Sequence, residues 1–210
     1  EEDEIVATVS VMGGEDWQAW IDLLGEERLL AEGARTLAYS YIGSEVTWPI
    51  YRDGTIGMAK KDLVQTGHQL NDMLASKYGG GAWVSVNKAV VTQASAAIPV
   101  VPLYLSLLFK VMKEKNLHEG CIEQMRRLAL DHLADGKSPV VDDQRLIRLD
   151  NLELSDEVQN EVIDLWDKVD TDNLKDISDF AGFRKEFSAL FGFQMEGIDY
   201  DEPLETEVRL

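Results

Sequence analysis

The stretch YSYIGSEVTWPIYRDGTIGMAK, residues 39–60, decides the fold of this chain. The apolar and aromatic run 36–42, which overlaps its start, predicts a buried strand. A long loop follows, and Trp48-Pro49 within it is expected to resist helix formation. An amphipathic helix is predicted to begin at Thr55 and to carry Lys60 in an early turn. The stretch therefore predicts a strand, a loop and a helix, in that order.

This order gathers three phenols and one amine near the end of a strand. Ligands of open α/β sheets bind outside the carboxyl ends of the strands. Tyr39, Tyr41, Tyr51 and Lys60 are therefore candidates for a proton-donating site. A lysine cation beside a phenol favours the phenolate, so Lys60 is expected to lower the pKa of Tyr51. Most tyrosine–lysine pairs at this spacing are unrelated surface groups, so the spacing alone defines no site.

Three segments carry a resemblance to a known family. They are TLAYSYIGSEVTWPIYRDGTIGMAK at 36–60, VSVNKAVVTQASAAIPVVPLYLSLLFKVMKEKNLHEGCIEQM at 84–125, and the tail motif FAGFRKEF…FGF at 180–193. The chain resembles the FabV-type trans-2-enoyl-thioester reductases, large members of the short-chain dehydrogenase/reductase superfamily. The signature of that family, a tyrosine followed by eight residues and a lysine, matches Tyr51 and Lys60.

The resemblance implies an activity and a set of roles. The activity is NADH-dependent reduction of the C2=C3 double bond of trans-2-enoyl thioesters, carried on acyl carrier protein or coenzyme A, in fatty acid synthesis. Tyr51 would stabilise the enolate oxygen and supply a proton, Lys60 would bind the nicotinamide ribose, and Tyr41 would contact the substrate. The residues implied to line the nicotinamide pocket are Val90, Val91 and Thr92, which also read as an ordinary strand end.

Two other functions stay open. Tyrosine and lysine also serve carbonyl reduction, so the reaction could be reduction of a 3-ketoacyl thioester. The chain could also be a non-catalytic helical interaction fragment, because it contains no GxGxxG phosphate loop. The run 79–81 consists of glycines, but it follows a predicted helix and precedes a predicted strand, which is the wrong order for such a loop.

The resemblance also implies a protein about twice this length. The chain is therefore expected to be the carboxyl-terminal half, with the missing N-terminal half of the same protein supplying the pyrophosphate loop. Alone, the chain is expected to bind NADH weakly and to be inactive.

Composition excludes several classes of partner. The net charge of −19, concentrated in residues 142–210, argues against nucleic acid and anionic membranes. The longest apolar run, 98–112, is too short to span a bilayer. A single cysteine, Cys121, excludes an internal disulfide and fits a reducing, cytoplasmic location. The three histidines are too scattered for a metal motif.

The predicted fold class is α/β. It comprises a partial Rossmann-like parallel sheet with flanking helices and an all-helical C-terminal region. The expected divisions are a helical lead-in at 1–33, the C-terminal half of the Rossmann-like catalytic domain at 34–120, and a helical C-terminal cap at 121–210. A second buried strand is predicted at 82–91. The helix predicted at 102–115 is apolar nearly all round, so part of its surface is expected to need the absent half or to favour self-association.

Smaller features predict packing. Trp17 and Trp20 share one helical stripe, and four phenylalanines recur between 180 and 191, so both sets are expected in the core. Gly67 lies in mid-helix, which favours close contact with a neighbouring element.

Overall fold

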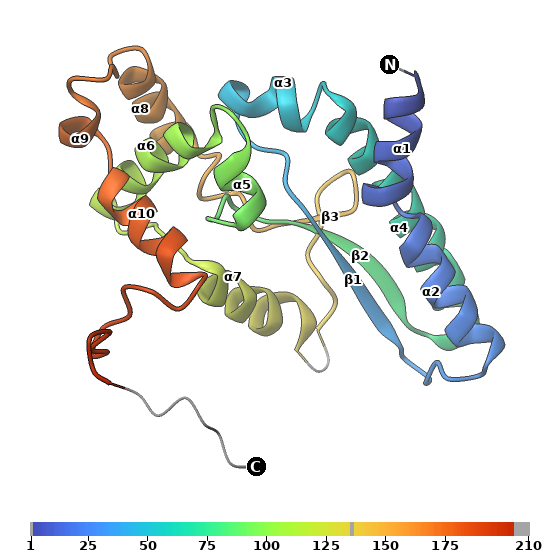
Figure 1. Cartoon of the computed structure of the whole chain (residues 1–210). Coiled ribbons are helices and arrows are strands. Elements are labelled where there is room, and N and C mark those ends of the chain that lie inside the picture. Colours follow the sequence, from blue (N-terminus) through green and yellow to red (C-terminus); the bar gives the residue numbers. More distant parts are fainter. Residues whose placement is uncertain (1, 135–136, 204–210) are drawn as a thin grey trace.

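The computed structural model describes residues 2–134 and 137–203 (Figure 1). Residues 1, 135, 136 and 204–210 of the predicted lead-in and cap lie outside the described residues. The helices and strands are α1 (Glu2–Met12), α2 (Glu15–Glu26), β1 (Arg35–Ser40), α3 (Trp48–Tyr51), α4 (Thr55–Tyr78), β2 (Gly81–Val86), α5 (Gln93–Ala97), α6 (Val101–Glu114), α7 (Cys121–Leu128), β3 (Leu146–Arg148), α8 (Asp156–Trp166), α9 (Leu174–Ile177) and α10 (Phe180–Ala189). A 3-10 turn (Glu45–Thr47) precedes α3, and a π-helical turn (Ala129–Leu133) extends α7.

The three strands form one parallel sheet in the order β1-β2-β3. Ser40 pairs with Val86, and Val86 pairs with Arg148, so all three strands end at the same level. The central strand β2 is buried along nearly its whole length, as expected for a strand covered on both faces. The segments that leave the three strands therefore start side by side at one edge of the sheet, where a ligand site is expected.

Helix α4 covers one face of the sheet. Its buried seam includes Leu63, Leu70 and Leu74. Gly67 lies on the same seam, where an added Cβ would come within 3.1 Å of Val84 in β2, and this confirms the close packing predicted for it. The helix ends at Gly79 in the left-handed conformation, as the glycine run predicts. Helices α1 and α2 pack against α4 (Figure 1).

A second helical layer lies beyond the carboxyl ends of the strands. It is built on α6, which packs against α5, α8 and α10 (Figure 1). Tyr104, Leu108 and Phe109 of α6 have no solvent exposure. The apolar surface of this helix is therefore covered by the chain itself, and the expectation that it needs another cover was wrong. Self-association of this protein stays a prediction, and the apolar surface of α6 does not support it.

Three segments differ from their predictions. Residues 48–51 form a short helix although Pro49 lies among them, because proline is tolerated in the first helical turn, where its missing N–H is not needed. The second strand ends at Val86 rather than residue 91. The region 121–210 is not all-helical, because β3 lies within it, where a short extended piece at 146–149 was expected, and adds the third strand to the sheet. The proposed division at residue 120 stays a prediction.

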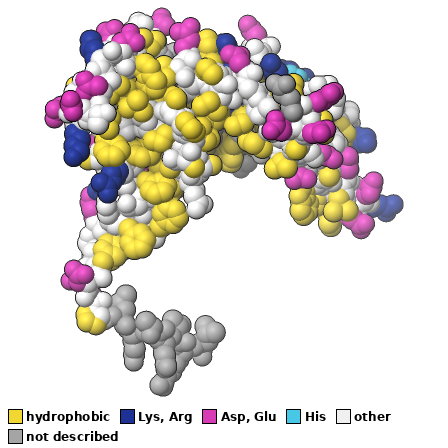
Figure 2. All heavy atoms as spheres, turned by 45° about the horizontal axis from the view of Figure 1, so that its top comes forward, with side chains coloured by type: hydrophobic (Ala, Val, Ile, Leu, Met, Phe, Trp, Pro, Cys, Tyr) yellow, Lys and Arg dark blue, Asp and Glu magenta, His cyan; other side chains and the backbone are white. Residues whose placement is uncertain are grey.

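Two aromatic stripes are only partly buried. Trp17 packs against the sheet and donates a hydrogen bond to Thr36, but Trp20 is 64% exposed. Phe183 is buried among the residues around α6, whereas Phe191 is 49% exposed. Figure 2 shows hydrophobic side chains continuing down the segment that leads towards the C-terminus. Helical spacing puts residues on one face, but the core covers only part of the length of each stripe.

The corner between α3 and α4 depends on Gly57. A Cβ at this position would lie 2.0 Å from the backbone carbonyl oxygen of Arg52, and backbone atoms cannot move aside without shifting the corner. We expect Gly57→Ala to destabilise the chain by about 1–3 kcal/mol, the usual range for overpacking. Met58→Ala, at the neighbouring exposed position, is the control and should change stability little. Urea denaturation of both variants measures this, and equal midpoints would contradict it.

Candidate active site

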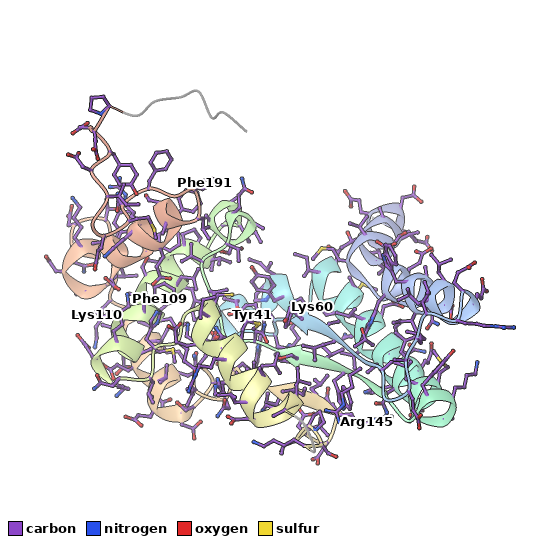
Figure 3. The ribbon with its side chains drawn as sticks, turned by 90° about the horizontal axis from the view of Figure 1, so that it is seen from below. Tyr41, Lys60, Phe109, Lys110, Arg145 and Phe191 are labelled. Atoms are coloured by element: carbon purple, nitrogen blue, oxygen red, sulfur yellow. The ribbon has the colours of Figure 1, made fainter. Side chains whose placement is uncertain are left out.

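A cavity of about 310 Å³ opens at the carboxyl ends of β1 and β2. One wall comes from the decisive stretch and consists of Ser40, Tyr41, Tyr51 and Lys60. The facing wall comes from the segment after β2 and from α6, and it includes Lys88, Val90, Thr92, Ser95 and Leu105. Figure 3 shows Tyr41 and Lys60 close together at the junction between the sheet and the second helical layer. The sequence-predicted residues thus meet where the topology places a ligand.

The corner after α3 brings Tyr51 and Lys60 together. On one continuous helix, residues nine positions apart would point in roughly opposite directions, about 180° apart. Here α3 ends at Tyr51 and α4 starts at Thr55, so both side chains face the same cavity. The Lys60 Nζ lies 5.1 Å from the ring centroid of Tyr51. The predicted juxtaposition is therefore present.

Tyr41 completes this group. Its ring meets the ring of Tyr51 edge-on, with centroids 4.8 Å apart and an interplanar angle of 84°. Lys60 Nζ lies 5.5 Å from the Tyr41 ring centroid and donates a hydrogen bond to the Tyr41 carbonyl oxygen. The ammonium thus lies near two aromatic rings, which attract cations through their negative faces.

Burial shifts the pKa values of this pair in opposite directions. It lowers the pKa of Lys60 to about 8, because desolvation disfavours the ammonium. It raises the pKa of Tyr51, because desolvation disfavours the phenolate. The predicted lowering of the Tyr51 pKa was wrong for this structure. The Lys60 ammonium lies over the ring and bonds to the Tyr41 carbonyl, while burial acts on the Tyr51 hydroxyl.

The two tyrosines differ in what their hydroxyls do. The Tyr41 hydroxyl donates to the Glu153 carboxylate at 2.9 Å, and burial together with that charge raises the pKa of Tyr41 well above its usual value. No hydrogen bond engages the Tyr51 hydroxyl within the described residues. Tyr51 is therefore available to a ligand, as is Tyr39, which lines the same cavity and is 57% exposed.

The three residues after β2 separate into two environments. Val90 and Thr92 line the cavity. Thr92 caps α5 reciprocally with Ser95, whose backbone N–H donates to the Thr92 hydroxyl and whose own hydroxyl accepts from the Thr92 N–H. Val91 is 7% exposed and packs with the residues around α6, and it is not among the residues that line this cavity. Their roles towards a nicotinamide stay predictions.

Sequence reasoning missed two buried charges beside the cavity. Lys88 is 1% exposed, and burial lowers its pKa to about 8. Glu153 has no exposure, and burial raises its pKa, although Lys88 and three hydrogen bonds oppose that shift. Glu153 lies in the acidic last third of the chain, where a carboxylate reads as a solvated surface group. No sequence pattern could have distinguished it.

Parallel strands with a tyrosine and a lysine at their carboxyl ends define a Rossmann-like fold of the short-chain dehydrogenase/reductase class. Residues 1–134 match the family described as the trans-2-enoyl-CoA reductase catalytic region, and residues 141–204 match the one described as the enoyl reductase FAD binding domain. The chain belongs to the trans-2-enoyl-CoA reductase family.

Relatives and solved structures are similar along nearly the whole chain. A trans-2-enoyl-CoA reductase of Euglena gracilis is 54% identical over 99% of this chain and 38% of its own length. An enoyl-[acyl-carrier-protein] reductase [NADH] of Pseudomonas putida is 52% identical over 99% of this chain and 52% of its own. The trans-2-enoyl-CoA reductase of Clostridium acetobutulicum in complex with NAD superposes with a TM-score of 0.94 at 48% identity, over 98% of this chain and 53% of that one. The chain thus spans about half the length of these relatives, or less.

The residues after β3 do not fit a flavin dinucleotide. The connection 149–155 contains no glycine. Two of its side chains, Asp150 and Glu153, are fully buried carboxylates. A pyrophosphate is bound by free backbone N–H groups at the start of a helix that follows a glycine-rich turn, and this connection offers no such turn. No chemical step is therefore assigned to a flavin.

Two further classes of feature are missing from the part of the chain that the structure describes. Within residues 2–134 and 137–203, no cluster of histidine, cysteine and acidic side chains could hold a metal ion. Over the same ranges, no helix has both the length and the apolar character needed to cross a bilayer.

The lowered pKa of Lys60 predicts how stability changes with pH. The unfolded chain binds more protons than the folded chain between pH 8 and the ordinary lysine value of 10.5, so stability rises with pH in that window. Relative to Lys60→Met, the parent's free energy of unfolding should rise by about 3 kcal/mol across it. Urea denaturation at each pH measures this, with Lys61→Met as the exposed neighbouring control. A difference that does not change with pH would contradict the lowered pKa.

Proposed function

We propose that the protein containing this chain uses NADH to reduce the C2=C3 double bond of trans-2-enoyl thioesters, carried on acyl carrier protein or coenzyme A, in fatty acid synthesis. One observation carries the proposal. The Tyr51 hydroxyl, which no other described residue engages, and the Lys60 ammonium share one cavity at the carboxyl ends of parallel strands. The names of the similar proteins, which include trans-2-enoyl-CoA reductase and enoyl-[acyl-carrier-protein] reductase [NADH], support the same reaction.

The cavity suits the nicotinamide and ribose portion of the cofactor. Lys60 offers a cation to ribose hydroxyls, while the segment of Val90 and Thr92 offers polar groups to a carboxamide. A bound reduced nicotinamide supplies hydride to the β-carbon of the thioester. The sequence of 210 residues contains no GxGxxG motif for the pyrophosphate. We assign the pyrophosphate loop to an N-terminal half of the same protein.

Tyr51 acts on the oxygen of the thioester. As a new C–H bond forms at C3, the electrons of the C2=C3 double bond move towards the carbonyl, and negative charge collects on its oxygen. The Tyr51 O–H donates a hydrogen bond to that oxygen, and its proton finally forms the new C–H bond at C2. Burial raises the pKa of Tyr51, which keeps the phenol protonated before reaction. The phenolate left behind regains a proton from solvent.

The remaining walls of the cavity bind the acyl group. Leu63, Val101 and Leu105 provide apolar surface, and the Tyr41 ring lies beside Tyr51. Because the Tyr41 hydroxyl is committed to Glu153, we assign Tyr41 to substrate contact rather than to proton transfer. The reaction needs no nucleic acid, and a cytoplasmic location stays a prediction.

Turnover of crotonyl thioesters by the complete enzyme tests the reaction. Turnover of acetoacetyl thioesters instead would identify a carbonyl reductase. Turnover of neither substrate would favour a non-catalytic interaction protein. NADH binding should be weak for the 210-residue chain and strong for the complete enzyme.

Tyr51→Phe removes only the hydroxyl. We expect turnover of crotonyl-coenzyme A by the complete enzyme to fall at least about 100-fold, because a positioned general acid contributes about 10²–10⁴ in rate. NADH affinity, measured by fluorescence titration, should change little. Tyr78→Phe, at the end of α4 and not among the residues that line the cavity, is the matched control. Normal turnover by Tyr51→Phe would remove this tyrosine from the mechanism.

The pH profile of kcat/KM reports Lys60 in the free enzyme. Burial places the pKa of Lys60 at about 8, so activity should fall as pH rises through that value and the ammonium is lost. Lys60→Arg carries a cation with a far higher pKa, so its weaker activity should persist to higher pH. If the kcat/KM of Lys60→Arg still falls near pH 8, the ionisation belongs to another group.

A further inference from the structure

A buried carboxylate outside the cavity joins the ends of the strands. Glu153 lies between β3 and α8 and has no solvent exposure. Its Oε1 accepts hydrogen bonds from the hydroxyls of Tyr41 at 2.9 Å and Tyr104 at 2.7 Å. Its Oε2 accepts from the backbone N–H of Ala89 at 2.6 Å. One side chain therefore holds the segments that follow β1 and β2, together with α6.

Because Glu153 is charged and buried, it requires its hydrogen-bond donors. A buried carboxylate without partners is strongly unfavourable, so its three donors must stay in place. The nearby Lys88 ammonium favours the charged form of Glu153 and donates to the Ala89 carbonyl oxygen at 2.6 Å. Ala89 is thus fixed through both of its backbone groups. The Tyr41 hydroxyl is fixed by the same carboxylate.

Tyr41 transmits this constraint to the proposed catalytic pair. Its ring is in edge contact with the ring of Tyr51, and its carbonyl oxygen accepts the hydrogen bond from Lys60. Fixing the hydroxyl of Tyr41 fixes the direction of its ring, which is the surface against which Tyr51 rests. Glu153 itself is not among the residues that line the cavity.

We propose that Glu153 is a positioning residue of the reductase: acting through Tyr41, it sets the orientation of Tyr51 towards the thioester. This inference rests on the function proposed above. It goes beyond that function because it assigns a role to a residue that contacts neither the substrate nor the cofactor.

Glu153→Gln tests the role in the complete enzyme, because it keeps the size of the side chain and removes its charge and one acceptor oxygen. We expect kcat for crotonyl-coenzyme A to fall about 10- to 100-fold, since a small misplacement at an active site can cost that much. The KM for NADH should stay within about twofold, because catalysis rather than binding is disturbed. Glu157→Gln removes an exposed carboxylate on α8 and should behave as the parent. A parent-like kcat in Glu153→Gln would overturn the proposal.

A double-mutant cycle tests the route through Tyr41. If Glu153 acts through that tyrosine, the losses in kcat caused by Glu153→Gln and by Tyr41→Phe should not multiply in the double variant. Losses that multiply fully would overturn the route.

A readout without turnover separates this proposal from the proposed reaction. In protein labelled with 3-fluorotyrosine, the ¹⁹F resonance of Tyr51, assigned with Tyr51→Phe, should move in Glu153→Gln and not in Glu157→Gln. An inactive parent would refute the reaction, whereas an unmoved Tyr51 resonance would refute the positioning role.

Glu153→Asp serves if Glu153→Gln does not fold. It keeps the charge and withdraws the carboxylate by one methylene group, so kcat should fall and the Tyr51 resonance should move. A parent-like kcat together with an unmoved resonance would overturn the proposal in that variant too.

Discussion

The geometry of the candidate site depends on one buried carboxylate. Glu153 has no contact with water, so its charge is stabilised by Tyr41, Tyr104, Ala89 and the nearby Lys88. Hydrogen bonds to a charged group contribute about 1.5–3 kcal/mol each. Removing the ion from water costs several kcal/mol, so the net gain in stability is small. What the arrangement provides is a single geometry, because each donor must point at the same two oxygen atoms.

That geometry matters because the site is assembled from separate elements. Parallel pairing ends β1, β2 and β3 at one level, which brings their following segments together. Helix α4 is fixed on the sheet by its buried seam and carries Lys60, while the short α3 carries Tyr51. Helix α6 closes the far side of the cavity with Val101 and Leu105. Glu153 lies where the sheet and this second layer meet, and it holds both in place.

Sequence patterns predicted the parts of the fold that local chemistry controls. The strand before Tyr41, the helix from Thr55 to the glycines and the close packing of Gly67 follow from apolar period, capping and side-chain size. The pairing of Tyr51 with Lys60 was predicted because the family resemblance added to a weak spacing signal. The short helix at Pro49 was missed because proline breaks helices in their interior but is tolerated at their start. The role of Glu153, the burial of Lys88 and the solvent exposure of Trp20 depend on contacts between segments far apart in sequence, and composition cannot report them.

The corner at residues 52–54 has a consequence for recognising related sites. Because the chain turns between α3 and α4, the distance between phenol and amine is set by how these two helices pack together and not by the helical repeat. A corner of different length between helices packed in the same way would preserve the same arrangement with a different number of intervening residues. Related enzymes can therefore differ in this interval through insertions or deletions and still share one active-site geometry. Searches based on spatial templates would recover such enzymes, whereas searches for a fixed sequence interval would not.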